Sequence, residues 1–447
     1  MPKMEIAGKP KYRKLGQDVD FFAFFKKIER KFDTCFIFES LGEEGKFSRY
    51  SIIGFDPRCV LSARGNVLSV GDIDYEVDNP YRELAKLFPQ KIIARNYAGG
   101  LVGYLSHEAV NYFEPAVQVK VDEDWDQFVF GFYTDGLVFD KLTNELFYFY
   151  FDEDRREMLQ EIFNLDIEDE LLEVSFVGDS MSEGEHAGVV ESVREQIIAG
   201  NIFQCEVGFK TRFKISGACL KIYEELRRVN PSPFMYYVKF GGKKIIGASP
   251  ELLFSLRDGE ITVEPLAGTI KRGKDAQEDQ KLARALLGDK KEVAEHNMLV
   301  DLHRNDVGRV SRFGTVRMRN LLTVKRFSHV AHIASEIVGL KGEKEDMFSA
   351  FAANFPAGTL TGAPKVEAIK IIDANEPQAR GPYGGGVGHF GFNGDCTFAV
   401  AIRSLFVNGE DAYAQTSSGI VYDSRAEKEY VEIQRKLEAM KYVLGSM

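Results

Sequence analysis

The chain has 447 residues, of which 44% are hydrophobic and 28% are charged, and its formal net charge is −11. These values are typical of a globular protein that buries a large core without disulfides or metals. The acidic balance excludes nucleic acid or a membrane surface as a partner held by bulk charge.

The cysteines and the N-terminal segment favour a reducing, cytoplasmic location. No two cysteines form a C-x-x-C pair, and their number is odd, so neither a zinc site nor a disulfide framework is indicated. The segment MPKMEIAGKPKYRK has no apolar run, so we expect no signal peptide. No stretch of about 20 apolar residues predicts a membrane-spanning helix.

The first 150 residues contain aromatic and β-branched runs separated by turn residues, a pattern typical of strands. KLTNEL and SARGNV are typical of hairpin connections. The next segment is acidic and ends in Gly, Ser and Met, which indicates a boundary. We therefore predict an N-terminal region over 1–165, a linker over 166–187 and a second region over 188–443. The strands expected in the first region span 32–40, 49–55, 127–134, 136–144 and 145–153.

Helical patterns appear in the second region, and strands lie between them. The last helix has Asp423 or Ser424 as its expected N-cap. Because strands and helices cluster instead of alternating, an α+β fold is favoured over a doubly wound sheet. The expected helices span 189–201, 219–229, 276–287, 289–309, 364–374 and 423–444, and the expected strands span 241–249, 252–266 and 386–423.

The stretch GVGHFG at 386–391 matches the dinucleotide-binding pattern G-x-G-x-x-G, and Glu410 and Asp411 follow about twenty residues later. That site requires a helix directly after the glycines. Here FNGD and a second apolar run follow, which is typical of a hairpin. We therefore expect a strand at this position and no nucleotide site.

Two expected helices carry carboxylates. Glu295 lies in EVAEHNMLVDLHRND, and the last helix presents Glu429, Glu432 and Lys436 on one face. Such a face is usually solvated. It could instead supply a Mg²⁺ site with one carboxylate from each helix, since Mg²⁺ takes few protein ligands. Both interpretations stay open from the pattern alone.

Residues suited to proton transfer and anion binding follow. His329 and His332 are either core residues or candidates for proton transfer near neutral pH. The segments FPAGTLTGAPK and ARGPYGG are either plain turns or places where backbone N–H groups approach an anion.

Taken in order, a series of segments resembles the chorismate-utilising enzymes, and among them the component I family of anthranilate synthases. The resemblance is dense from about 188 to 443, and residues 1–150 resemble the more variable N-terminal region. It implies an α+β fold in which two large antiparallel sheets form a sandwich flanked by helices. The segments are GNIFQ, NPSPFMYY, GASPELL, EPLAGTIKRG, AEHNMLVDLHRNDVGRV, SHVAHI, FPAGTLTGAPK, RGPYGGGVGHFGF, AIRS and EYVEIQRKLEAM.

This resemblance implies a substrate site for chorismate. Glu295 and Glu432 correspond to the ligands of the cofactor Mg²⁺, which holds a carboxylate of the substrate. The family's Gly-Ala-Gly turn reads Ser-Ser-Gly here, which keeps its backbone N–H donors. The positions that correspond to substrate contacts are Gly268, Thr269, Tyr383, Arg403, Ser417, Ser418, Gly419 and Lys436.

The resemblance also implies catalytic roles. Glu251 corresponds to the general acid that protonates the leaving C4 hydroxyl of chorismate, which requires a protonated and desolvated carboxyl. Gln204 stands where water-adding relatives carry lysine, and an amide positions ammonia. The C-E-V-G that follows departs from the usual apolar pattern. His332 corresponds to the residue of the second step, in which the C2 proton and pyruvate leave, and Thr359 to one that orients the ring.

The implied reaction converts chorismate and ammonia to anthranilate and pyruvate in tryptophan biosynthesis. Aminodeoxychorismate synthases are an alternative, but they carry a nucleophilic lysine where this chain has Ala267. Isochorismate synthases are another, against which Gln204 argues. A silent tryptophan-sensing subunit is a third alternative.

A partner and a regulator are implied as well. No glutaminase nucleophile motif appears, so ammonia is expected from a glutamine amidotransferase on a separate chain. Glu39 and Ser40 in FIFES resemble an element that binds tryptophan as a feedback inhibitor. Its partner segment corresponds to Pro233, Phe234 and Met235. The alternative is that both segments are ordinary core strands.

Overall fold

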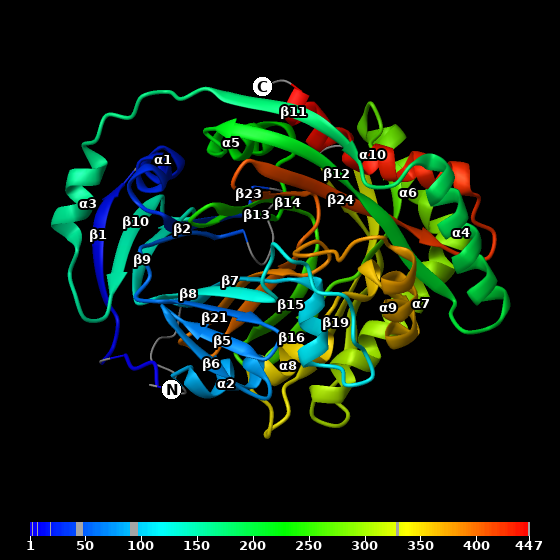
Figure 1. Cartoon of the computed structure of the whole chain (residues 1–447), viewed down its shortest axis with the longest axis horizontal. Coiled ribbons are helices and arrows are strands. Elements are labelled where there is room, and N and C mark those ends of the chain that lie inside the picture. The colour runs from blue at the N-terminus through cyan, green and yellow to red at the C-terminus, as the bar shows by residue number, and fades with distance from the viewer. Residues whose placement is uncertain are drawn as a thin grey trace.

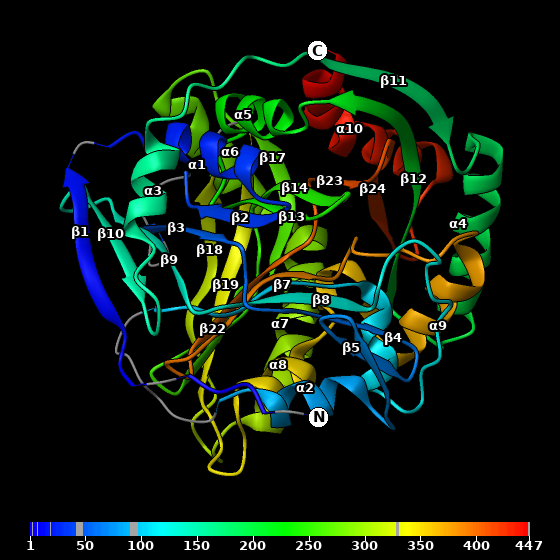
Figure 2. The same ribbon diagram turned by 60° about the vertical axis from the view of Figure 1, so that its left-hand side comes forward.

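The computed structural model describes residues 1, 3–6, 8–17, 19–41, 48–89, 97–327 and 330–445. Within these residues the strands form two twelve-stranded sheets. Figure 1 shows the sheets as two layers with helices on the outside, and Figure 2 shows the same layers from another side. The predicted α+β sandwich of two antiparallel sheets is confirmed.

The first sheet combines strands from both ends of the chain, and its described pairings are antiparallel. In spatial order it contains β1 (Lys11–Gln17), β10 (Glu145–Tyr150), β9 (Asp135–Asp140), β3 (Tyr50–Phe55), β2 (Thr34–Glu39), β13 (Phe234–Phe240), β14 (Lys243–Ser249), β23 (Ser404–Asn408), β24 (Asp411–Ile420), β12 (Gln204–Gly217) and β11 (Leu172–Asp179), with β20 (Gly362–Ala363) beside β12.

The second sheet is also antiparallel in its described pairings and is likewise mixed in origin. In spatial order it contains β17 (Leu266–Lys271), β19 (Val330–Leu340), β16 (Glu260–Val263), β15 (Leu252–Arg257), β22 (Cys396–Val400), β21 (Gly386–Gly391), β7 (Gly100–Leu105), β8 (Phe128–Tyr133), β4 (Val60–Arg64), β5 (Val67–Val70) and β6 (Ile73–Glu76), with β18 (Arg317–Arg326) beside β19.

Helices cover the outer faces. Those packed on the first sheet include α1, α4, α5 and α10, and those packed on the second include α6, α7 and α8. The helices are α1 (Phe21–Lys31), α2 (Pro80–Leu87), η1 (His107–Tyr112), α3 (Arg156–Phe163), α4 (Glu183–Ile198), α5 (Leu220–Val229), α6 (Ala276–Gly288), α7 (Lys290–Val310), α8 (Met347–Asn354), η2 (Gly358–Leu360), α9 (Lys365–Asn375) and α10 (Ala426–Gly445).

The N-terminal and C-terminal parts of the chain meet inside both sheets. In the first sheet β2 pairs with β13, and in the second sheet β7 pairs with β21. The segment 166–187, expected to be a linker, forms β11 and the first turn of α4, whose N-cap Ser182 makes a capping box with Glu185. β11 extends the first sheet at its edge by pairing with β12, so this segment is part of the sheet.

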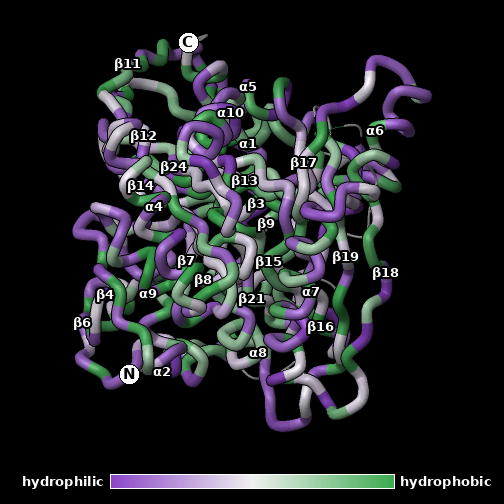
Figure 3. The backbone as a smooth tube through the Cα atoms, turned by 90° about the vertical axis from the view of Figure 1, so that its right-hand side faces the viewer, coloured by the Kyte–Doolittle hydropathy of each residue, from purple (hydrophilic) through white to green (hydrophobic). Residues whose placement is uncertain are grey.

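The main core lies between the two sheets and is rich in phenylalanine. Phe36 of β2 contacts Tyr133 of β8 across the two sheets with ring centroids 4.9 Å apart, and both are fully buried. The core continues on the outer face of the second sheet, where buried Phe390 and Phe398 pack against Phe351 of α8. Figure 3 shows hydrophobic segments concentrated in the interior strands and hydrophilic ones in the outer loops. Burial of these large side chains drives the two layers together.

Several local predictions are confirmed. The predicted hairpin connections KLTNEL and SARGNV join β9 to β10 and β4 to β5. GVGHFG forms β21, which pairs with β22 and β7 and is followed by a turn, not by a helix. The prediction that this stretch is no nucleotide loop therefore agrees with the strand that forms there.

Candidate active site

A group of predicted site residues gathers where β12 and β24 pair and where α7 and α10 cover the sheets. A cavity of about 80 Å³ opens beside α10, and its lining includes Tyr383, Arg403 and Lys436. These three residues come from a loop, a strand connection and a helix that are distant in sequence. The fold therefore brings together predicted substrate contacts that the sequence could only name separately.

Glu251 lies in the short connection between β14 and β15, and only 5% of its surface is exposed. Thr359 Oγ1 of η2 donates a hydrogen bond of 2.6 Å to Glu251 Oε1. Burial raises the pKa of Glu251 to about 8, although the hydrogen bond from Thr359 opposes the shift. Near neutral pH this carboxyl is mainly protonated, as a general acid must be.

His332 lies on β19 opposite Thr269 of β17. Its Nδ1 atom is 2.8 Å from the Gly268 carbonyl oxygen and 3.1 Å from Thr269 Oγ1. Burial lowers the pKa of His332 to about 4, and the charges of Arg403 and Lys436 act in the same direction. A neutral imidazole therefore faces the site, with one ring nitrogen fixed by the β17 backbone. The other candidate, His329, lies outside the described residues.

The β17 segment that contacts His332 needs a glycine at position 268. Its φ is +62°, a conformation that favours glycine. A Cβ atom there would also lie 2.9 Å from Glu292 Oε2 of α7. Glycine at this position lets β17 approach α7, which carries the predicted metal ligand Glu295.

Carboxylates of α7 and α10 affect each other's pKa values. Burial, and in addition the charge of Glu432 of α10, raise the pKa of Glu292 of α7. Glu295 Oε1 is buried and has no hydrogen-bond partner among the described residues, but Lys291 Nζ forms an ion pair with it at 3.6 Å. Burial raises the pKa of Glu295 to about 7, Lys291 opposes the shift, and Glu292 and Glu206 reinforce it. On α10, Glu432 forms an ion pair of 2.7 Å with Lys436. Among the described residues, no group of three or more acidic, histidine or cysteine side chains is gathered closely enough to hold a metal ion, so the Mg²⁺ site stays a prediction.

Two cations stand beside these carboxylates. Arg403 has a positive φ of 52°, which is rare for a residue with a side chain and costs about 1–3 kcal/mol. Its guanidinium donates a 2.5 Å hydrogen bond to the Lys436 carbonyl oxygen, and Lys436 Nζ donates one of 2.8 Å to the Ser417 carbonyl oxygen. Burial lowers the pKa of Arg403. The strained backbone and the desolvated charge are both features of a binding site for an anion.

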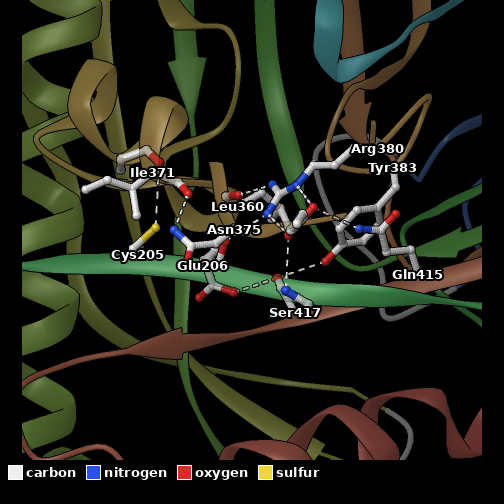
Figure 4. Close-up of polar contacts among 12 residues, drawn as sticks. Cys205, Glu206, Leu360, Ile371, Asn375, Arg380, Tyr383, Gln415 and Ser417 are labelled. Atoms are coloured by element: carbon white, nitrogen blue, oxygen red, sulfur yellow. Dashed lines mark hydrogen bonds and ion pairs between the residues drawn. The ribbon is translucent and has the colours of Figure 1, made fainter. Parts of the chain in front are cut away.

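A hydrogen-bonded chain runs along one side of the site, as Figure 4 shows. The Tyr383 hydroxyl is 2.9 Å from Ser417 Oγ, and Ser417 Oγ donates to Glu206 Oε2 at 2.7 Å. Behind it, buried Arg380 pairs with Glu376 at 2.7 Å and donates to the Glu206 carbonyl oxygen at 2.8 Å. Arg380 thus fixes the backbone of β12 at the site.

Gln204 and Gly419 lie beside this hydrogen-bonded chain. Gln204 is the first residue of β12, and its buried Oε1 atom has no partner among the described residues. Glu206 pairs in register with Gly419 of β24. A Cβ atom on Gly419 would lie 2.5 Å from Gln204 Nε2, so any side chain at position 419 would collide with the Gln204 amide. Ser418, between Ser417 and Gly419, pairs with Val207 and is buried.

The two segments predicted to bind tryptophan lie side by side at the junction of β2 and β13, where Met235 pairs with Glu39. Arg227 Nε of α5 and the Tyr223 hydroxyl donate to the Glu39 carboxylate at 2.8 and 3.0 Å. Lys141 Nζ donates to the Ser40 carbonyl oxygen. Pro233 and Phe234 directly precede Met235, so they lie at the same end of β13.

Comparison with known proteins identifies the family. Residues 33–442 match the model of the family described as chorismate binding enzyme. The chain belongs to the chorismate binding enzyme family. The resemblance inferred from the separate segments is thereby confirmed over most of the chain.

Relatives within this family cover nearly the whole chain. A protein of Leptospira biflexa named anthranilate synthase component 1 is 47% identical over 99% of this chain and 98% of its own length. One of Methanothermobacter thermautotrophicus with the same name is 40% identical over 95% and 92%. The solved structure of anthranilate synthase component I from Streptococcus pneumoniae has a TM-score of 0.79 at 31% identity and covers 89% of this chain and 93% of that one.

Sequence reasoning missed three residues of the site, namely Glu206, Glu376 and Arg380. A glutamate within the apolar run from Cys205 to Val207 was the available signal for Glu206. The i, i+4 spacing of Glu376 and Arg380 could have indicated an ion pair, but not its burial. Among the described helices, none is both long and apolar enough to cross a membrane.

Proposed function

We propose that this protein is the synthase subunit of an anthranilate synthase, an oxo-acid-lyase that converts chorismate and ammonia to anthranilate and pyruvate. The observation that carries this proposal is that burial raises the pKa of Glu251 to about 8 and lowers the pKa of His332 to about 4, which gives the site an acid with its proton and a base without one. The full-length relatives named anthranilate synthase component 1 support it.

Arg403 and Lys436 bind the two carboxylates of chorismate, since each is a cation at the cavity. Backbone N–H groups of Ser418 and Gly419 and the hydroxyl groups of Thr269 and Tyr383 complete the substrate contacts.

The chemistry proceeds in two steps. Glu251 gives its proton to the leaving C4 hydroxyl while ammonia attacks C2, and Thr359 orients Glu251 through their hydrogen bond. His332 then accepts the C2 proton. Loss of pyruvate produces the aromatic ring, which makes this step irreversible.

The proposed function includes a Mg²⁺ ion between the carboxylates of α7 and α10, which would have to move closer together to bind it, since no ready metal-binding group exists among the described residues. Glu295, whose Oε1 atom has Lys291 Nζ at 3.6 Å as its ion-pair partner, and Glu432 are the residues that would hold it. When bound, Mg²⁺ neutralises a carboxylate of the substrate and fixes its position. Glu292 and Glu429, whose pKa values are raised by burial, stand nearby on the same two helices.

Residues at two positions disfavour the other family activities. Ala267 precedes Gly268 on β17 and offers no amine for a covalent adduct, which aminodeoxychorismate synthesis requires. Gln204 is a poor base for water, which isochorismate synthesis requires. Direct attack of ammonia at C2 is the chemistry that both residues allow.

A glutamine amidotransferase on a separate chain supplies the ammonia, and tryptophan inhibits by binding at the junction of β2 and β13. The support for the regulator site is the proximity of Glu39 and Met235. We place the enzyme in the cytoplasm, consistent with its free cysteines.

The test mixes the purified chain with chorismate, Mg²⁺ and an ammonium salt at about pH 8.5, where free ammonia replaces the partner. Anthranilate fluorescence and pyruvate are measured together, with Glu251→Gln as the inactive control. Equal amounts of both products are the expected result. Loss of chorismate without pyruvate would indicate an aminated or isomerised product, and no loss would contradict an enzymatic role.

A further inference from the structure

Glu206 is a buried carboxylate to which none of the roles above is assigned. Only 8% of its surface is exposed, and it lies two residues after Gln204, on the same face of β12. A carboxylate in such a place loses its hydration, so it persists where partners or a function offset that loss.

One partner of Glu206 is Ser417 of the neighbouring strand β24. Its hydroxyl donates to Glu206 Oε2 at 2.7 Å, as Figure 4 shows. This pairing holds one carboxylate oxygen and leaves the other, Oε1, directed elsewhere.

That second oxygen lies beside Gly419, as the Gln204 amide nitrogen does. A Cβ atom built on Gly419 would lie 2.8 Å from Glu206 Oε1 and 2.5 Å from Gln204 Nε2. The amide nitrogen and the carboxylate oxygen therefore both pack against Gly419, which has room for them only because it lacks a side chain. The buried Gln204 Oε1 has no partner among the described residues, so the amide has a free acceptor.

Charged groups face Glu206 from several elements. Burial raises the pKa of Glu206, and the negative charge of Glu432 of α10 acts in the same direction. Lys436 of α10 and Arg380, after α9, oppose the shift, and Glu206 in turn raises the pKa values of Glu251 and Glu295. A carboxylate in this setting is a better proton acceptor than one in water.

We propose that Gln204 and Glu206 form the subsite for the attacking ammonia, with Gln204 Oε1 accepting an N–H hydrogen bond and Glu206 accepting a proton. This inference rests on the proposed amination. Attack forms the bond between nitrogen and C2 and breaks the bond between C4 and oxygen. The leaving hydroxyl takes the Glu251 proton and departs as water, and the new ammonium substituent gives its surplus proton to Glu206.

This arrangement conserves charge within the site. Glu251 becomes a carboxylate in the same step in which Glu206 becomes a neutral carboxyl. An amide alone cannot take the proton, because it is not basic near neutral pH. The base therefore has to be a neighbour of Gln204, and Glu206 is the buried carboxylate on the same strand face.

The test is steady-state kinetics of Glu206→Gln, with ammonium varied at saturating chorismate and chorismate varied at saturating ammonium. We expect kcat/KM for ammonium to fall about 30-fold or more and KM for chorismate to stay within about twofold. Asp411→Asn is the matched control, since Asp411 is an exposed carboxylate on β24 paired with Lys214. It should match the wild type.

Ser417→Gly is the second variant, and it keeps the inference testable if Glu206→Gln fails to fold. It removes the hydrogen bond to Glu206, and we expect about a fivefold rise in KM for ammonium. Unchanged ammonium kinetics in the folded variants would overturn the subsite. A rise in KM for chorismate alone would overturn it too and would assign Glu206 to the substrate. A wild type that makes no anthranilate would instead refute the proposed function.

Discussion

At the scale of single residues, burial decides which side chains of this site can exchange protons. Glu251 and His332 are both desolvated, yet the consequences are opposite, because burial favours the neutral form of each. The pKa of the carboxyl rises to about 8, and that of the imidazole falls to about 4. At neutral pH the site therefore holds an acid with its proton and a base without one.

The first prediction concerns the acid. If Glu251 donates a proton, kcat should fall as the pH rises through about 8, measured at constant free ammonia. Glu251→Gln should lower kcat by about 10²- to 10⁴-fold. Thr359→Val, which removes the 2.6 Å hydrogen bond, should cause a smaller loss. A pH profile that stays flat from 6 to 9 would contradict the assignment.

The second prediction separates activity from stability at the same residue. The folded-state pKa of Glu251 lies above its ordinary value of 4.5, so the folded protein binds more protons than the unfolded chain between about pH 4.5 and 8. The unfavourable contribution is absent below that window and complete above it. Glu251→Gln should therefore melt at the same or a higher temperature than the wild type at pH 8.5. A markedly lower melting temperature would show that the carboxylate is stabilising.

The third prediction concerns His332. In the proposed mechanism, His332→Met removes the acceptor for the C2 proton and puts an apolar side chain of similar size in its place, so the first step should continue while the second stops. We expect chorismate consumption with at least about 10²-fold less pyruvate, because the aminated intermediate accumulates. Product analysis by mass spectrometry measures this. Unchanged anthranilate output would remove His332 from the mechanism.

At the scale of elements, the sequence predicted strands and helices well but not how distant ones combine. Alternating apolar residues and turn signals located β9, β10 and β21, because those signals are local. The pairing of β2 with β13 joins segments about 200 residues apart, and nothing in either segment specifies that partner. Glu206 was missed for the same reason, since its partner Ser417 comes from a distant strand.

The fourth prediction tests the junction of β2 and β13 at this scale. Glu39 is buried and holds Arg227 and Tyr223 of α5 against the end of β2. Glu39→Ala leaves these donors without their acceptor and should destabilise the protein by about 2 kcal/mol. Glu225→Gln is the control on the same helix, because its pair with Arg228 is exposed and should contribute less than about 0.5 kcal/mol. Equal melting temperatures for both variants would contradict this role of Glu39.

At the scale of the whole molecule, both sheets are shared between the two regions that the sequence suggests. Separation of residues 1–165 from the rest would break the pairing of β2 with β13 in one sheet and of β7 with β21 in the other. Each fragment would then expose unpaired strand edges and part of the phenylalanine core between the sheets.

The fifth prediction follows from this interleaving. The fragments 1–165 and 166–447, produced separately, should aggregate or lack cooperative melting, because neither can complete a sheet or cover its inner face. Produced together, they should recover a soluble complex that consumes chorismate, since the strand pairs and the core can re-form without the covalent link. Circular dichroism melting and chorismate turnover measure both properties. A fragment 166–447 that melts cooperatively and turns over chorismate alone would show that the catalytic region is an independent domain.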